Sequence, residues 1–321
     1  MTPKKIFVFL FNFFLGISLL LTTLCSCENQ NKFQKEEKEK NFVTSFYPMY
    51  IFAKNITNGA KNVKVTNMTQ PQTGCLHDYQ LLPKDIKKLE NADAFIINGG
   101  DTESFMEKIF DSKPNLFVIT ASEGLYCEDE HHEEHEHEKS HKHSHEKDGH
   151  NHENSHFWTY IPYATKQIKN ITSGLCEVDF ENAELYKKNS EEYIKRLSEL
   201  DKNFKESIKN FKSKKIITTD EAFEYFAEGY GLEIVGTLNT EHNSAPSAKE
   251  LKNLCDIAKT TQIPIFVARN SNKTAAETVA SETNSKIFEL NPITTGSYEN
   301  LSAYEDAMKS NLSELKKALK H

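Results

Sequence analysis

The sequence lacks the closely paired cysteines that mark many redox and zinc-binding proteins. It contains no C-x-x-C. It also lacks an excess of positive charge, since 47 acidic residues outnumber 39 basic ones and give a net charge of −8. Nucleic-acid binding requires a basic face, so we expect no nucleic-acid partner.

Cysteine is scarce and widely spaced. Two of the six cysteines, Cys25 and Cys27, lie close to the N-terminus. The other four permit three different pairings into two disulfides, and four free thiols are an equal alternative that spacing does not decide. These four are Cys75, Cys127, Cys176 and Cys255.

The N-terminus has the pattern of a secretion signal. Two lysines precede a strongly apolar run over residues 6–24, and Leu24-Cys25-Ser26-Cys27 follows as a lipoprotein processing site. We therefore expect a signal peptide over 1–26, with an uncleaved membrane helix as the alternative. A diacylated Cys27 would anchor the chain to a membrane outside the cytoplasm. The polar, charged residues 27–40 predict a disordered tether.

Histidine is concentrated in one tract that contains no large apolar residue, so the tract cannot form a packed core. Neutral imidazoles beside carboxylates are good ligands for Zn²⁺ and similar divalent metals. We expect a metal-binding loop over residues 128–155, with a solvated acidic loop that binds no ligand as the alternative. The nine histidines are His131, His132, His135, His137, His141, His143, His145, His150 and His152.

Strand and helix patterns alternate on both sides of this loop. Such alternation predicts the α/β class, with parallel sheets covered by helices on both faces. The expected strands are residues 41–46, 63–68, 94–98 and 116–120 before the loop, and 215–218, 233–236, 263–268 and 286–290 after it.

A long helical pattern separates the two groups of strands, because apolar residues recur at steps of three, four or seven from Asp179 to about Phe211. We therefore predict two lobes, each a small, mostly parallel sheet flanked by helices. The N-terminal lobe would span 41–175, a linking helix 176–212 and the C-terminal lobe 213–321. A metal would bind in the cleft between the lobes, at the ends of the strands.

Candidate ligands are few at these strand ends. His77 follows the second expected strand, and His156 stands beside the only tryptophan, where the chain re-enters the fold after the loop. Asp220 and Glu221 follow the strand over 215–218, and Asn291 and Thr294 follow the last strand. A lone histidine after a strand is more often a capping or surface residue than a ligand, so these residues alone leave both interpretations open.

A set of short motifs occurs in a characteristic order over nearly all of the chain after the signal. It resembles the zinc-binding branch of the solute-binding lipoproteins that serve bacterial ABC importers, the ZnuA/AdcA type, whose H-D-Y, P-x-D-[IV], H-x-W, Y-G-L and L-[ND]-P stretches it matches. The matching residues are Thr44-Ser45-Phe46-Tyr47-Pro48, His77-Asp78-Tyr79, Pro83-Lys84-Asp85-Ile86, Ala92-Asp93, Asn98-Gly99, Glu103, His156-Phe157-Trp158, Ala222-Phe223, Tyr225-Phe226, Tyr230-Gly231-Leu232, Pro246-Ser247 and Leu290-Asn291-Pro292.

The resemblance implies that His77 and His156 are metal ligands. The third family ligand, His in zinc members and Glu in some manganese members, is Asp220 here. The resemblance also places an acidic residue near the L-[ND]-P stretch, where this chain has Asn291 and Thr294, and another two residues before the first histidine, where it has Cys75.

Three ligand sets follow from these departures. Water could complete a site of His77, His156 and Asp220, which is the set we expect. The Cys75 thiolate could join and favour zinc. Alternatively the site is degraded and the histidine-rich loop is the main metal binder. Glu221 and Asn291 are further candidate ligands.

The resemblance implies an extracytoplasmic, lipid-anchored, monomeric protein that captures Zn²⁺ and delivers it to a membrane permease, without catalysis. Mn²⁺ stays open as the alternative metal. A secreted zinc hydrolase is the rival class, with Glu221 as general base, and strand-end ligands drawn from opposite lobes disfavour it. An adhesin is compatible with lipid anchoring, although no residue points to a host ligand.

Overall fold

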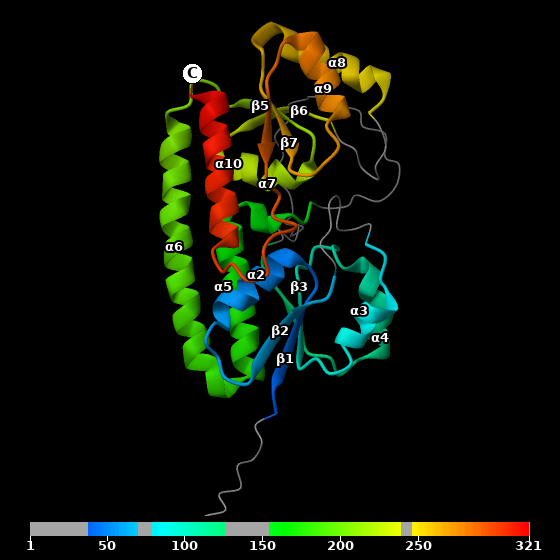
Figure 1. Cartoon of the computed structure of the whole chain (residues 1–321), viewed down its shortest axis with the longest axis vertical. Helices are drawn as coiled ribbons and strands as arrows, with labels where there is room; N and C mark the ends of the chain where they lie inside the picture. The colour runs from blue at the N-terminus through cyan, green and yellow to red at the C-terminus, as the bar shows by residue number, and fades with distance from the viewer. Residues whose placement is uncertain (1–37, 70–78, 126–153, 239–245, 321) are drawn as a thin grey trace, which may run out of the picture. The chain divides into compact units, whose positions relative to one another are not determined.

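The computed structural model describes residues 38–69, 79–125, 154–238 and 246–320. The first lobe is built on four parallel strands in the order β2-β1-β3-β4 (Figure 1). Most apolar residues of the two central strands, β1 and β3, are buried, as expected of parallel strands that helices cover. The strands are β1 (Lys40–Thr44), β2 (Val63–Asn67), β3 (Ala94–Ile97) and β4 (Val118–Thr120).

The second lobe repeats this topology. Its four strands are again parallel, and their order β6-β5-β7-β8 is the same as that of the first sheet. In both sheets the strand order reverses beside the first strand, and in open α/β sheets the crevice at such a point is the usual place for a ligand. The strands are β5 (Lys215–Thr218), β6 (Glu233–Thr237), β7 (Ile265–Ala268) and β8 (Ile287–Leu290).

Helices connect the strands within each lobe, and one more, α10, follows the last strand. Proline near the start favours α2 and α3, because its missing N–H would be unpaired there in any case. A capping box of Ser247 and Glu250 begins α8, and Gly231, with φ +69°, ends α7. These helices are α2 (Tyr47–Ile56), α3 (Pro83–Lys88), η3 (Ser104–Met106), α4 (Glu107–Ser112), η6 (Glu221–Phe223), α7 (Glu224–Tyr230), α8 (Ala248–Thr261), α9 (Thr274–Thr283) and α10 (Ala303–Leu319).

Two long helices lie between the lobes in sequence, where we predicted one. The predicted linking helix is present as α6 (Ala183–Lys209), whose 27 residues extend about 40 Å and follow the short η5 (Phe180–Asn182). The patterns above predict no helix over α5 (Ile161–Val178). Its buried apolar residues nevertheless recur at steps of three and four, which is the spacing of a helix. They are Ile161, Ala164, Ile168, Ile171 and Leu175.

One continuous core joins the two lobes. On α6, the Tyr193 ring lies 6.3 Å from Phe52 of α2 in the first lobe, and the Phe204 ring stacks 4.8 Å from Tyr230 of α7 in the second. On α10, Tyr304 returns to the first lobe, with its ring 5.3 Å from Phe52. Both helices run alongside the two lobes (Figure 1), so the predicted two-lobe α/β fold with a long connecting helix is confirmed.

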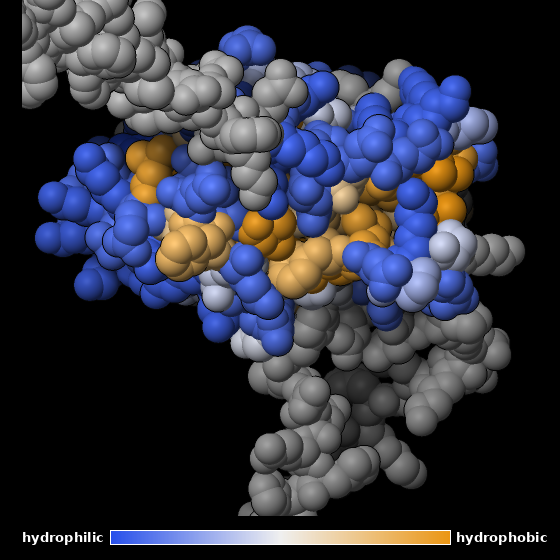
Figure 2. Space-filling model, turned by 90° about the horizontal axis from the view of Figure 1, so that it is seen from below, coloured by the Kyte–Doolittle hydropathy of each residue, from blue (hydrophilic) through white to orange (hydrophobic). Residues whose placement is uncertain are grey.

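The described surface is mainly hydrophilic. Figure 2 shows polar side chains over most of one face, with hydrophobic ones gathered near its middle. Among the described residues, the exposed large hydrophobic side chains are those of Leu82, Phe180 and Ile257. No helix in the described ranges is both long and apolar enough to cross a membrane.

Some predictions concern residues outside the described ranges. The signal peptide, the lipidation site Cys27, and the cysteines Cys75 and Cys127 all lie there. The two described cysteines, Cys176 and Cys255, are free thiols, so these two do not pair with each other. The lobe limits of 41–175 and 213–321 stay predictions.

Candidate metal centre

The structure describes only part of the predicted metal site. His156, Asp220, Glu221, Asn291 and Thr294 are described, whereas His77, Cys75 and all nine histidines of the loop lie outside the described residues. Within the described ranges, no three His, Cys, Asp or Glu side chains form a group that could hold a metal ion. A complete ligand set therefore needs residues from outside these ranges.

His156 is buried at the entry to η4 (Phe157–Thr159), the first turn after the histidine-rich segment. It is 4% exposed, and its ring lies 5.1 Å from that of Trp158. Trp158 is fully buried, and its Nε1 donates a 2.8 Å hydrogen bond to the carbonyl of Pro292 after β8. The indole therefore packs against the imidazole and, through its hydrogen bond, connects this turn to the second lobe.

A buried polar network holds the backbone that carries His156. Asn98, directly after β3, donates through Nδ2 to the carbonyl of Ser155 at 2.9 Å. The Oδ1 of Asn98 accepts from Gln167 of α5 at 2.8 Å. Every one of these partners is buried, so the network fixes the position of the residue next to His156.

Glu103 is the charged member of this network. Its Oε1 accepts from the Ser45 hydroxyl at 2.6 Å and from the Asn98 N–H at 2.8 Å, and its Oε2 accepts from the Gly99 N–H at 3.0 Å. Burial nevertheless dominates and raises the pKa of Glu103 to about 7, against the lowering effect of these three donors. The network thus contains a carboxyl group that changes charge near neutral pH.

Asp220 lies at the carboxyl end of β5, where it caps η6. Its Oδ1 accepts a 2.8 Å hydrogen bond from the Ala222 N–H. Burial raises the pKa of Asp220, and this backbone hydrogen bond opposes the shift. A partly buried carboxylate is stabilised by a nearby cation, which is the property required of a metal ligand.

The side chain of Asn154 connects the two predicted ligand positions. Its Oδ1 lies 2.9 Å from the backbone nitrogen of His156 and 3.0 Å from the ring Nδ1. Its Nδ2 donates to the carbonyl of Glu221 at 2.8 Å and to the exposed carboxylate of Glu224 at 2.9 Å. The structure thus links His156 to the turn that begins at Asp220, and the shared metal site itself stays a prediction.

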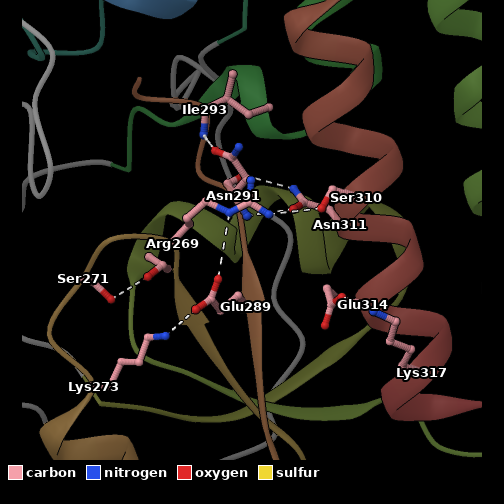
Figure 3. Close-up of polar contacts among 11 residues, drawn as sticks. Arg269, Ser271, Lys273, Glu289, Asn291, Ile293, Ser310, Asn311, Glu314 and Lys317 are labelled. Carbon is pink, nitrogen blue, oxygen red and sulfur yellow. Dashed lines mark hydrogen bonds and ion pairs between the residues drawn. The ribbon is translucent and has the colours of Figure 1, made fainter. Parts of the chain in front are cut away.

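Asn291, a further candidate ligand, forms hydrogen bonds within its own turn. Figure 3 shows its side chain directed at the backbone of its own turn, where Oδ1 accepts from the Ile293 N–H at 2.8 Å. Asn311 of α10 accepts from the Asn291 N–H at 2.7 Å and donates to its carbonyl at 3.0 Å. Asn291 therefore shapes the turn that presents Pro292 to Trp158, and Thr294 is buried after it.

Charged residues near this turn pair with one another. Glu289 of β8 forms ion pairs with Lys273 and Arg269 (Figure 3), and Lys273 chiefly lowers the pKa of Glu289. These groups are partly exposed and occupied in surface pairs.

Sequence reasoning singled out His156 and Asp220 but gave no role to Asn154. The available signal was its position, two residues before a candidate ligand. Asn98 and Glu103 match family motifs, but the sequence gives them no function. Folding brings Asn98 to the Ser155 carbonyl and Glu103 to the Asn98 N–H.

Comparison with known proteins identifies the family. A family model described as "Zinc-uptake complex component A periplasmic" (ZnuA) matches residues 42–318. The chain belongs to this family. Members of the ZnuA family are components of zinc-uptake systems, which is not a class of enzyme. The word "periplasmic" in the description places them outside the cytoplasm.

Individual ZnuA relatives agree with this assignment. The chain is 33% identical to the high-affinity zinc uptake system protein ZnuA of Bacillus subtilis over 96% of each chain. It is 30% identical to the zinc-binding lipoprotein AdcA of Streptococcus pneumoniae, over 94% of this chain but only 60% of AdcA. The zinc-bound ZnuA-like domain of pneumococcal AdcA superposes with a TM-score of 0.70 at 25% identity, covering 88% of this chain and 100% of that domain.

Proposed function

We propose that this chain is the extracytoplasmic zinc-binding component of an ABC importer, which captures Zn²⁺ and hands it to a membrane permease. The observation that carries the proposal is the position of His156. Its imidazole is buried against Trp158 and linked through one amide to the turn that begins at Asp220. An imidazole and a carboxylate, brought together from different halves of the chain, are suitable ligands for zinc.

The proposed ligands are His77, His156 and Asp220, with a water molecule completing the coordination. Cys75 and Glu221 are alternatives for the remaining position. The turn-forming role of Asn291 favours the smaller set, because its Oδ1 already accepts a backbone hydrogen bond. The nine histidines of the loop would collect Zn²⁺ weakly and raise its concentration near the higher-affinity site.

The remaining features of the proposal concern location and partners. A lipid at Cys27 would hold the monomeric protein at the outer face of the membrane, next to its permease. We infer that the chain performs no catalysis, since it belongs to a transport family and its candidate ligands come from both halves of the chain.

Zinc titration of a histidine variant tests the site. The background is the full chain with its nine loop histidines replaced by asparagine, so that the loop does not mask the high-affinity site. His156→Asn leaves an amide that can donate toward Asn154 in place of Nδ1, but it lacks Nε2. We expect zinc affinity, measured by chelator competition, to fall more than about 100-fold, beyond the loss typical of outer-shell residues.

Two comparisons make this test specific. His321→Asn, a change of the last residue of the chain, is the matched histidine control and should leave affinity unchanged. Competition between Zn²⁺ and Mn²⁺ in the same background decides the metal. Tight zinc binding that survives His156→Asn would contradict the proposed site.

A further inference from the structure

The side-chain amide of Asn154 contacts residues on both sides of the candidate site. Its side chain bonds the backbone and ring of His156 on one side, and Glu221 and Glu224 on the other. Residue 154 precedes α5 in the chain, whereas Glu221 and Glu224 follow β5, so the amide spans 67 and 70 positions of sequence. Its contacts settle which end of the amide faces which group.

The orientation of the amide follows from partners whose hydrogen-bonding roles are fixed. The backbone N–H of His156 can only donate, so the Asn154 atom 2.9 Å from it must be the oxygen. The Glu221 carbonyl can only accept, so the atom 2.8 Å from it must be the nitrogen. The two contacts agree, and reversing the amide would break both.

This orientation determines the tautomer of His156. Nδ1 lies 3.0 Å from the same amide oxygen, which has no hydrogen to offer. Nδ1 must therefore carry the proton for this contact to be a hydrogen bond. In a neutral imidazole the lone pair then lies on Nε2, and Nε2 is the nitrogen that can bind a metal.

The other end of the amide positions the second ligand. Glu221 is the residue after Asp220, and its carbonyl is held in the partly buried bond from Asn154 Nδ2. The contact with Glu224 is exposed and contributes less. One side chain thus determines the metal-binding nitrogen of His156 and links His156 to the Asp220 turn.

We propose that Asn154 is a positioning residue of the metal site, which fixes the Nδ1–H tautomer of His156 and holds that residue against the turn that carries Asp220. This inference rests on the proposed function, because it assumes that His156 and Asp220 bind zinc. Carbonyl and carboxylate partners that orient histidine ligands are a general property of metal sites, and here a neutral amide takes that part.

The test uses the full chain with its nine loop histidines replaced by asparagine, and zinc as the probe. Nitrogen-15 NMR of the metal-free protein reports the tautomer of His156, and chelator competition reports zinc affinity. Asn154→Ala removes all four side-chain contacts, so we expect a mixture of tautomers and a loss of affinity of about 10–100-fold. Far-ultraviolet circular dichroism establishes that each variant is folded.

Two further variants separate the two contacts. Asn154→Asp keeps an oxygen facing Nδ1–H but turns a second oxygen toward the Glu221 carbonyl. We expect the wild-type tautomer and an affinity between those of the wild type and Asn154→Ala. Glu224→Ala removes only the exposed contact and should change neither tautomer nor affinity.

The outcomes distinguish this inference from the proposed function. If Asn154→Ala keeps the wild-type tautomer and zinc affinity while His156→Asn loses binding, the inference is wrong and the zinc site stands. An Nε2–H tautomer in Asn154→Asp would also overturn it, even if Asn154→Ala fails to fold. If His156→Asn binds zinc as tightly as the parent, the proposed site itself is wrong.

Discussion

Glu103 should make the stability of this protein depend on pH in the direction opposite to that of a salt-bridged carboxylate. The side chain is 4% exposed, and burial raises its pKa from 4.5 to about 7. Between these values the folded protein holds a proton that the unfolded chain has released. Stability therefore falls as pH rises through this window.

The size of the effect follows from the shift in pKa. Each unit corresponds to about 1.4 kcal/mol, so a rise from 4.5 to about 7 predicts a loss of about 3 kcal/mol across the window. Glu103→Gln removes the titrating carboxyl group and therefore this dependence on pH. The new amide nitrogen would face the Gly99 N–H or another donor of the network, which costs about 1–3 kcal/mol at every pH. Only the loss that comes from the titration of Glu103 varies with pH.

Urea denaturation between pH 4.5 and pH 8 measures both effects. We expect the stability of the wild type, relative to Glu103→Gln, to decline by about 3 kcal/mol as pH rises through the window. Glu228→Gln, a change of an exposed glutamate, controls for altered net charge. If the difference in the free energy of unfolding between the wild type and Glu103→Gln stays constant with pH, the reasoning is refuted. It would mean that Glu103 titrates alike in the folded and the unfolded protein.

Two packing predictions test the surroundings of the site. Trp158→Phe removes the hydrogen bond to the Pro292 carbonyl and leaves a cavity, so we expect a loss of about 2–4 kcal/mol in urea denaturation; unchanged stability would show that the indole is not needed there. Gly174→Ala in α5 would place a Cβ 2.6 Å from the Ile119 side chain of β4 and should cost about 1–3 kcal/mol. Exposed Ser173→Ala is its control, and equal stability of the two variants would contradict this packing.

The fold could be predicted largely from local patterns. All eight expected strands are present, because runs such as Ala94–Ile97 and Ile265–Ala268 are apolar throughout and bounded by polar or turn residues. The helix α5 was missed, since isoleucine and threonine favour strands in isolation and its helical spacing becomes decisive only when α6 and β4 cover one face. The end of the connecting helix was predicted within two residues.

The site could be predicted only in part. His156 and Asp220 carry chemistry that a sequence shows directly, and the structure places them beside a shared amide. The role of that amide could not be read from sequence, because Asn154 matches no motif and its partner at Glu221 is 67 positions away. The contact of Asn98 with Ser155 is equally non-local. Outer-shell contacts of this kind depend on tertiary structure alone.

The connections between the lobes limit how metal could be released. Wide hinge closure of the kind seen in many binding proteins requires an interface that can open at low cost. Here Phe204 stacks on Tyr230, and Tyr304 packs on Phe52 and donates to the Trp158 carbonyl at 2.8 Å, all fully or nearly buried. Exposing even two such rings would cost several kcal/mol, at about 1.5–3 kcal/mol each. We therefore expect release to depend on local movement of the turns around His156 and Asp220, which the amide of Asn154 and the stacked rings of Phe157 and Tyr225 hold together.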